Sequence, residues 1–360
     1  MPSTLLKAAL LASAPLSCLS VTFTPEQSSI LSGGLSNLPI PYDVAGSMYG
    51  NSGHSIGDSF WSTSFLHGSD DHDYMVLSHA VRGLPFTPAM FRGSIYDITA
   101  QTYQQFTYLS NNTDFYADNG NGAINVTLDN FGYGATQSTN AETQLRTFST
   151  APEVQYDLTF QLGTPALLNG GLGFFACPNS NLTCQERSSP SDTTTGSLVV
   201  NGTTVTVDPT RSLTWFDRQW GNPVNWTWFE LHLQTEGTES AVDTKLSIWI
   251  YPDNNGTVVQ LATIRETQGV QNVEPVLSFV PGARTYTSPE TGSVYSLDHE
   301  LSLLDDTNFL ISSPHDNQEM RAGNQIPTYE GYITVTGTYK GKTTTGFGVV
   351  EILPLLQAPA

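Results

Sequence analysis

The chain is poor in charged residues, and poorest in basic ones. Charged side chains make up 13% of its 360 residues, and 13 Lys and Arg stand against 33 Asp and Glu, which gives a net charge of −20. Such an acidic surface repels phosphate backbones and anionic membranes. We therefore expect no nucleic-acid partner, and the low charge content favours β-structure with many turns over helices rich in Glu, Lys and Ala.

Long apolar runs are missing as well. After residue 20 no stretch is continuously apolar over the thickness of a membrane, so we expect no membrane anchor. The first 20 residues combine Lys7, a short apolar run over 8–16 and then small residues, which is the layout of a cleaved signal peptide. These features predict a protein that is secreted or held in the lumen of the secretory pathway.

Cysteine is rare, with three residues in the whole chain. Cys18 falls in the predicted signal peptide, so Cys177 and Cys184 remain, and in an oxidising compartment we expect them to form one small-loop disulfide worth about 2–3 kcal/mol. Six N-x-[ST] sequons agree with secretion and are the predicted glycosylation sites: Asn111, Asn125, Asn181, Asn201, Asn225 and Asn255.

Signatures of metal and redox-cofactor sites are missing or incomplete. No H-E-x-x-H motif or zinc-type Cys/His spacing occurs, and the acidic run at 70–73 is typical of a surface turn, so we expect no metal. Gly171, Gly173 and Ala176 match a dinucleotide fingerprint, but Pro178 follows where a helix should continue. We therefore expect no cofactor.

Residues 53–57, GHSIG, fit the G-x-S-x-G nucleophile elbow of lipases and esterases. That elbow needs a strand before the serine and a helix after it, whereas DSFWSTSFLH over 58–67 alternates like a strand. A glycine-rich entry into a strand is therefore favoured over a serine hydrolase with Ser55 as nucleophile.

What the chain does have is apolar alternation with a period of two, the pattern of half-buried strands. The segments that show it are 60–67, 73–81, 155–162, 196–207, 226–234, 244–251, 257–264 and 332–339. Asn255-Gly256 between two of them predicts a hairpin, and the Ser/Thr-rich stretch 185–197 predicts an exposed loop. Because long capped helices are lacking, we predict an all-β antiparallel fold rather than a parallel α/β sheet.

Several segments, in this order and spacing, resemble one family. Residues 214–221, TWFDRQWG, followed by NWTWFELHLQTEG over 225–237, are similar to the W-x-D-x-Q-W-G signature of the hydroxyneurosporene synthase (CrtC)/AttH-like family. Residues 58–81 resemble that family's acidic-Ser-aromatic-Trp strand with its partner strand. Residues 329–352 resemble its Y-W-E-G...G...G-x-G-x-x-E ending.

The resemblance implies two lipocalin-like antiparallel β-barrel domains packed side by side, with a pocket at their contact. We place the N-terminal domain at 21–208 and the C-terminal domain at 209–360, after the signal peptide at 1–20. Members include hydratases of carotenoids and of a phytoalexin, and fungal Diels-Alderases of polyketide and terpenoid pathways. They act on bulky, largely apolar molecules without a redox cofactor, so an apolar small molecule is the expected partner.

Alternation along the two signature strands predicts a face that combines aromatic rings with a carboxylate, an amide and an imidazole. Such a face suits a site that encloses an apolar ligand and orients it through a few polar contacts. The expected substrate-binding residues are Trp61, Trp215, Asp217, Gln219, Trp228, Glu230, His232 and Tyr329. Structural roles are the alternatives: Asp217 and Arg218 as a pair that joins the domains, and the tryptophans as core.

Asp58 and Glu330 are the expected catalytic residues. A carboxyl group in an apolar pocket has a raised pKa and can donate a proton near neutral pH. The sequence departs from the family at both places, because Asp58 stands where members often have Glu and Tyr329 precedes Glu330 where many have Trp. Alternatively, each carboxylate accepts backbone hydrogen bonds at a strand end.

Three functions stay open. A cyclase of Diels-Alder or hetero-Diels-Alder type would fold a polyketide or terpenoid substrate into a reactive shape. A hydratase would protonate an alkene and position water, and a non-catalytic carrier would bind an apolar metabolite without turnover. Few carboxylates among many aromatic residues favour the cyclase.

Overall fold

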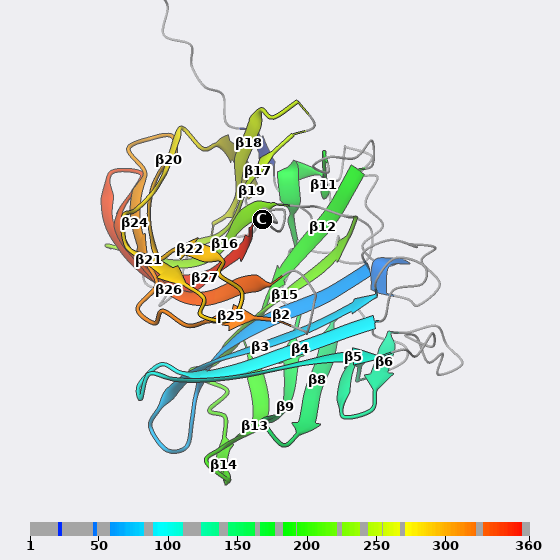
Figure 1. The fold of residues 1–360 in the computed structure, drawn as a ribbon. Helices are drawn as coiled ribbons and strands as arrows, with labels where there is room; N and C mark the ends of the chain where they lie inside the picture. Colours follow the sequence, from blue (N-terminus) through cyan, green and yellow to red (C-terminus); the bar gives the residue numbers. More distant parts are fainter. Residues whose placement is uncertain are drawn as a thin grey trace, which may run out of the picture.

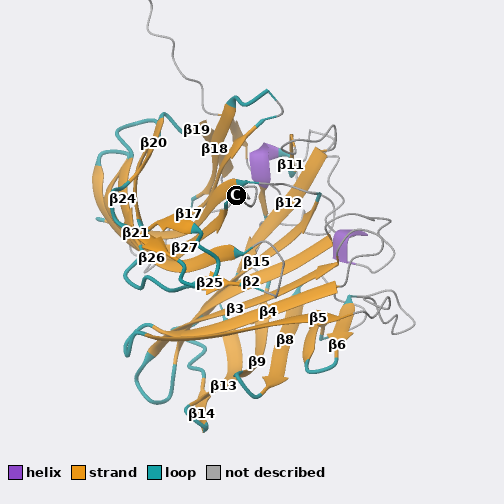
Figure 2. Cartoon of the chain, viewed as in Figure 1, coloured by secondary structure: helices purple, strands orange, loops and turns teal. Residues whose placement is uncertain are grey.

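The computed structural model describes residues 21–23, 46–48, 58–82, 89–110, 124–136, 143–162, 166–176, 183–191, 193–221, 225–237, 244–253, 255–266, 271–321 and 327–354. Most of this part of the chain is antiparallel strand, and its helical turns are the short 3-10 turns η1 (Gly46–Met48) and η2 (Asn169–Gly171) (Figure 2). No helix in these ranges is long and apolar enough to cross a membrane. The predicted all-β fold is confirmed.

The first half of the molecule is built from two packed sheets (Figure 1). One has the order β10-β12-β15-β2-β3-β4-β5, with β11 beside β12; its strands are β2 (Asp58–His67), β3 (Asp73–Arg82), β4 (Ala89–Asp97), β5 (Thr102–Ser110), β10 (Leu167–Leu168), β11 (Phe174–Ala176), β12 (Thr183–Pro190) and β15 (Leu213–Trp220). The other has the order β14-β13-β9-β8-β7-β6; its strands are β6 (Asn125–Leu128), β7 (Phe131–Ala135), β8 (Gln144–Ala151), β9 (Val154–Gln161), β13 (Thr194–Val200) and β14 (Thr203–Thr206). Phe60, Phe91 and Phe216 of the first sheet pack with Phe131 and Leu145 of the second in a shared core.

One long sheet forms the second half and curls around its own core (Figure 1). Its order is β1-β19-β18-β17-β16-β27-β26-β24-β23-β20, with β25 beside β26. The strands are β1 (Val21–Phe23), β16 (Trp226–Thr235), β17 (Thr244–Pro252), β18 (Val258–Arg265), β19 (Gln271–Pro275), β20 (Ser278–Pro281), β23 (Asp298–Ser302), β24 (Asn308–Ser312), β25 (Glu319–Met320), β26 (Thr328–Tyr339) and β27 (Lys342–Leu353), beside a small hairpin of β21 (Thr285–Thr287) and β22 (Val294–Ser296). The curled sheet encloses Phe229, Leu231, Ile248, Tyr295 and Phe309.

Alternation along β16 divides its side chains between two environments. Phe229 and Leu231 point into the second core. Trp228 and Glu230 point outward, where they contact Trp61 and Thr63 of β2. The outer face of this sheet therefore packs against the first sheet, and the predicted division of faces is confirmed for this strand.

Two local predictions have opposite outcomes. The hairpin at Asn255-Gly256 is confirmed, because β17 and β18 pair in antiparallel register and the Gly256 N–H donates to the Asp253 carbonyl at 3.0 Å. The exposed loop over 185–197 is wrong, because residues 185–190 belong to β12 and pair with β15, and residues 194–197 begin β13 and pair with β9. Polar side chains are buried here because β12 is an interior strand, with β15 on one side and β10 and β11 on the other, so composition alone misidentified it.

The change from the first half to the second comes later than residue 208. β15 follows the predicted boundary, yet it pairs with β2 and β12 of the first sheet. β1 lies before β2 in the sequence but pairs with β19 of the second half. Sheet membership therefore changes between Trp220 and Trp226.

Candidate active site

The two halves meet in a buried layer between the first sheet and the outer face of β16, β17, β26 and β27. Tryptophan rings from both sides fill much of it: Trp61, Trp215, Trp228 and Trp249 are all buried. The rings of Trp61 and Trp228 meet edge to face with centroids 5.1 Å apart, and those of Trp215 and Trp228 with centroids 6.4 Å apart. We call this region the contact layer; its walls are aromatic and its dielectric is low.

Five carboxyl groups lie in the contact layer: Glu186, Asp217, Glu230, Glu330 and Glu351. Burial is the largest cause that raises the pKa of every one of them. A carboxyl group removed from water holds its proton to higher pH because its charged form loses hydration. The contact layer can therefore present protonated acids near neutral pH.

Glu330 and Glu351 form the centre of this cluster. They lie opposite each other on β26 and β27, and Arg92 Nη2 of β4 is 2.8 Å from Glu330 Oε1 and 3.6 Å from Glu351 Oε1. The Trp61 indole N–H donates to Glu330 Oε2 at 3.2 Å, and the Trp226 indole N–H donates to Glu351 Oε2 at 3.1 Å. Burial and repulsion from Glu351 hold the pKa of Glu330 well above its usual range, although Arg92 lowers it. One guanidinium thus faces two carboxyls, and the pair retains a proton.

Glu186 and Asp217 are a second acidic pair, on neighbouring strands β12 and β15. The Trp215 indole N–H donates to Asp217 Oδ1 at 2.8 Å. Burial raises the pKa of Asp217 to about 8, against hydrogen bonds from Ser188 and Trp215 that lower it. Burial, with repulsion from Asp217 and Glu351, raises the pKa of Glu186 well above its usual range.

Glu230 forms a neutral pair with His232. His232 Nε2 is 2.6 Å from Glu230 Oε1, and the Thr63 hydroxyl donates to Glu230 Oε2. Burial raises the pKa of Glu230 and lowers that of His232, so both are uncharged and are joined by one hydrogen bond. The imidazole stacks on Phe347 with ring centroids 5.2 Å apart, and in the described part of the chain its Nδ1 has no hydrogen-bond partner.

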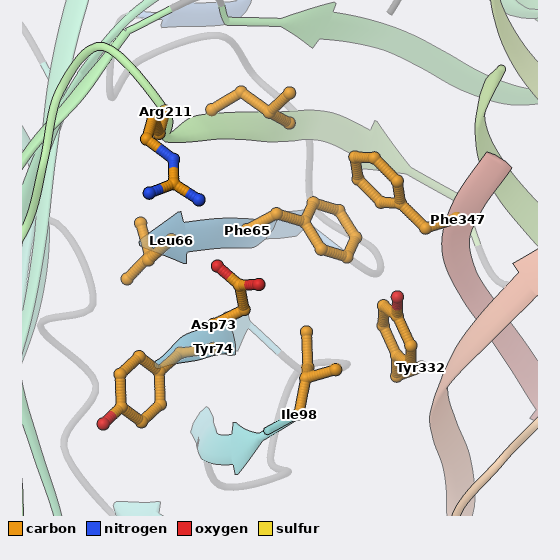
Figure 3. Close-up of a pocket in the computed structure, with 9 residues that line it drawn as sticks. Phe65, Leu66, Asp73, Tyr74, Ile98, Arg211, Tyr332 and Phe347 are labelled. Atoms are coloured by element: carbon orange, nitrogen blue, oxygen red, sulfur yellow. The ribbon is translucent and has the colours of Figure 1, made fainter. Parts of the chain in front are cut away.

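A cavity of about 210 Å³ adjoins the contact layer (Figure 3). Its lining is Phe65, Leu66, Asp73, Tyr74, Ile98, Arg211, Leu213, Tyr332 and Phe347. The Phe65 ring is 4.7 Å from that of Phe347 and 5.4 Å from that of His232, while Tyr332 lies two residues after Glu330 on the same face of β26. Aromatic walls next to a few polar groups suit an apolar ligand.

The structure does not bring the two predicted catalytic carboxyls together. Asp58 lies on the face of β2 opposite Trp61 and forms a buried ion pair with Arg218. Arg218 also donates to the Ser47 carbonyl at 2.8 Å. The suggested pair of Asp217 with Arg218 is not formed, because adjacent strand residues face opposite ways. This geometry favours a structural role for Asp58.

Tyr329 is also displaced from the contact layer. Its ring packs in the second core with its centroid 5.1 Å from that of Tyr295, and its hydroxyl donates to the His315 carbonyl at 3.0 Å. It therefore faces away from Glu330. The other predicted substrate-binding residues do share the contact layer: Trp61, Trp215, Asp217, Gln219, Trp228, Glu230 and His232.

The predicted modification sites are only partly within the described residues. Cys184 is disulfide-bonded, and its predicted partner Cys177 lies outside that part of the chain. Asn201 and Asn255 lie in exposed turns, and Asn125 and Asn225 are half-buried. Also outside the described residues are Asn111, Asn181, Ser55 and the predicted signal peptide.

Comparison with known proteins identifies the family. The family model described as AttH-like matches residues 89–353. The chain belongs to the AttH-like family. Kievitone hydratase of Fusarium solani subsp. phaseoli is 33% identical over 343 residues, which cover 92% of this chain and 91% of that protein. Dehydratase asqC of Emericella nidulans is 30% identical over 339 residues, which cover 88% of this chain and 90% of that protein.

Solved structures agree with this assignment. The crystal structure of kievitone hydratase from Nectria haematococca superposes with a TM-score of 0.77 at 30% identity and covers 92% of this AttH-like chain and 98% of its own. A putative AttH from Nitrosomonas europaea has a TM-score of 0.64 at 19% identity, covers 83% of this chain and 92% of its own, and shows the fold alone. The resemblance noted from the sequence motifs is confirmed, and the relatives support an enzyme.

Sequence reasoning missed three polar members of this AttH-like site: Arg92, Glu186 and Glu351. Glu351 ends the G-x-G-x-x-E pattern quoted above, so a signal for it was present. Arg92 is a lone charge inside the otherwise uncharged core of a strand, a pattern that marks a paired buried ion. Glu186 was hidden in the stretch expected to be a loop.

The raised pKa values predict that stability falls as pH rises. Between pH of about 4 and about 8 folded Asp217 keeps a proton that the unfolded chain releases, so the free energy of unfolding falls through that window by up to about 1.4 kcal/mol per pH unit for this group. Urea unfolding at pH 5, 6, 7 and 8 measures the slope, and Asp217→Asn should flatten it. An unchanged slope in that variant would contradict the assignment.

Proposed function

We propose that this AttH-like protein is a hydro-lyase that adds water to, or removes it from, an apolar small molecule of secondary metabolism, using its own side chains for acid–base chemistry. The observation that carries the proposal is that two buried carboxyl groups, those of Glu330 and Glu351, face the single guanidinium of Arg92. Such a pair holds one acid and one base in the same place. The names of the two relatives, a hydratase and a dehydratase, support this direction of chemistry.

In hydration, the protonated carboxyl of Glu330 gives its proton to one alkene carbon. The oxygen of a water molecule forms a bond to the other carbon, and a proton of that water passes to the carboxylate of the pair. Dehydration is the same sequence in reverse: the protonated partner of the pair gives its proton to the departing hydroxyl, and the Glu330 carboxylate takes the proton from the neighbouring carbon. Arg92 and the indole N–H groups of Trp61 and Trp226 stabilise the negative charge on the pair.

A polar strip beside Arg92 supports a place for the water or for hydroxyl groups of the substrate. On the same face of β4 and β5 lie Ser94, Tyr96, Gln105 and Thr107. Tyr96, Gln105 and Thr107 each have a buried side-chain oxygen without a hydrogen-bond partner among the described residues. Buried polar groups are normally bonded, so a row of open ones beside an acid indicates ligand contacts.

The preference for a cyclase rested on the small number of carboxylates near the aromatic residues, and the contact layer removes that reason. It gathers five carboxyl groups, where a mould for a cyclisation needs shape and a few hydrogen-bond donors. The aromatic walls fit either chemistry. The buried acids, together with the relatives, favour water addition or removal.

The test is a mass-spectrometric comparison of metabolites from the source organism with and without this gene. We expect the lost product to differ by one water from the compound that accumulates. The purified protein should then convert that compound, and in hydration it should incorporate oxygen from heavy-oxygen water. A precursor and product of equal mass would identify an isomerising cyclase instead, and binding without conversion would identify a carrier.

A further inference from the structure

A buried histidine contacts Arg92 through the same nitrogen, Nη2, that faces Glu330 and Glu351. His79 of β3 is buried between β2 and β4. Its Nε2 is 2.8 Å from the Ser59 hydroxyl oxygen, and its Nδ1 is 2.7 Å from Arg92 Nη2 and 3.2 Å from Arg92 Nε. Hydrogen bonds thus link Ser59 to His79 and His79 to Arg92. Arg92 in turn contacts Glu330 and Glu351.

The chemistry of arginine determines the tautomer of this imidazole. A guanidinium has only donors, so His79 Nδ1 must be the unprotonated acceptor and Nε2 must carry the hydrogen. Nε2 then donates to the Ser59 oxygen. Burial, and then the positive charge of Arg92, lower the pKa of His79 well below its usual range, which keeps the ring neutral.

This tautomer excludes one attractive assignment. A buried serine within hydrogen-bond reach of a histidine resembles a nucleophile with its base. Here the nitrogen that faces Ser59 already carries a hydrogen and cannot accept the hydroxyl proton. Ser59 instead accepts a hydrogen bond that fixes the orientation of the His79 ring. The free acceptor of that ring, Nδ1, faces Arg92.

We propose that His79 is a positioning residue that, by accepting from two nitrogens of Arg92, holds the guanidinium against Glu330 and Glu351. Arg92 approaches the pair within 2.8 and 3.6 Å, so a small rotation of its planar group would change the charge that the pair experiences. His79 therefore determines the pH at which the pair releases its proton. The kinetic consequence rests on the proposed function, whereas the titration of the pair does not.

Two matched variants separate this role from simple packing. His79→Phe keeps a ring of similar shape but removes the acceptor, while His79→Asn can place its amide oxygen near the position of Nδ1. The readout is the carboxylic C=O stretching band in infrared titrations, assigned to the pair by subtracting the spectra of Glu330→Gln. This measurement needs no substrate.

In His79→Phe we expect the titration midpoint of the pair to rise by about one pH unit or more, because an opposite charge moves away from it. His79→Asn should keep the midpoint within about 0.3 unit of the wild type, a difference too small to indicate a lost ion pair. If Phe prevents folding, His79→Gln tests the same point, since it can bond Ser59 but offers no acceptor at Nδ1. Equal midpoints in all folded variants would overturn the proposal.

Kinetics then separate this proposal from the proposed function. If wild-type protein hydrates its substrate, the acid limb of its pH–rate profile should move to higher pH in His79→Phe and return in His79→Asn. If wild-type protein shows no hydration or dehydration, the proposed function fails, while the infrared titration still decides the role of His79.

Discussion

Glu330→Gln is expected to lower the turnover number about 100- to 10,000-fold, the usual contribution of a general acid, with KM changed only a few-fold. The amide keeps the shape of the side chain and can still accept the hydrogen bond from the Trp61 indole, but it has no acidic proton to deliver. Steady-state kinetics on the substrate identified by the metabolite comparison would measure the loss.

The matched control is Glu300→Gln, the same change at an exposed position on β23. It should leave both kinetic constants unchanged. A Glu330→Gln enzyme that retains its full rate would remove Glu330 from the mechanism and leave the Glu186–Asp217 pair as the next candidate acid.

Asp58→Asn is expected to cost about 3 kcal/mol of unfolding free energy, the lower end of the range for a buried pair that loses one partner. The substitution leaves the Arg218 guanidinium buried without its carboxylate, although the Ser47 carbonyl still accepts one of its hydrogen bonds and the Phe60 ring lies 4.1 Å from its carbon. Activity per folded molecule should be retained, since Asp58 faces away from the contact layer. Urea unfolding and active-site-normalised rates measure the two effects separately.

The exposed pair of Arg146 and Asp157 provides the comparison. These side chains are 47% and 51% exposed with Nε 2.7 Å from Oδ1, so Asp157→Asn should cost about 0–1 kcal/mol. If Asp58→Asn costs no more than this and instead abolishes turnover, Asp58 is catalytic after all and the contact layer is not the whole site.

Much of the site could be predicted where it follows from alternation along one strand. Trp215 and Asp217 were placed on one face of their strand, and Trp228, Glu230 and His232 on one face of the next; the structure has both faces in the contact layer. This inference needs no knowledge of the tertiary fold, because strand geometry alone fixes which side chains share a side.

Two misplaced residues could have been corrected by the same rule. Asp58 and Trp61 are three positions apart and so face opposite ways in a continuous strand, as do the adjacent Tyr329 and Glu330. The family motifs place both members of each pair in one pocket, whereas strand geometry directs them to opposite faces. The motif identified the strands correctly, but it did not say which of their residues reach the site.

The remaining part of the site was out of reach because it depends on contacts between distant strands. Arg92 of β4 meets Glu330 of β26 only after both halves have folded and packed. His79 gains its role from Arg92, and the burial of Glu186 depends on β12 being paired with β15. Local patterns carry no information on which strand faces which across a layer.

The strands that carry the site also have consequences for how this family can diversify. Each strand of the contact layer contributes to a core through every second residue and to the site through the others, so inserting or deleting one residue would exchange the two sets and ruin both. Substitutions at the outward positions carry no such penalty. We therefore expect members of this family to acquire new substrates through substitutions of outward side chains and through changes in the loops. The lengths of the strands, and with them the spacing of W-x-D-x-Q-W-G, should stay constant.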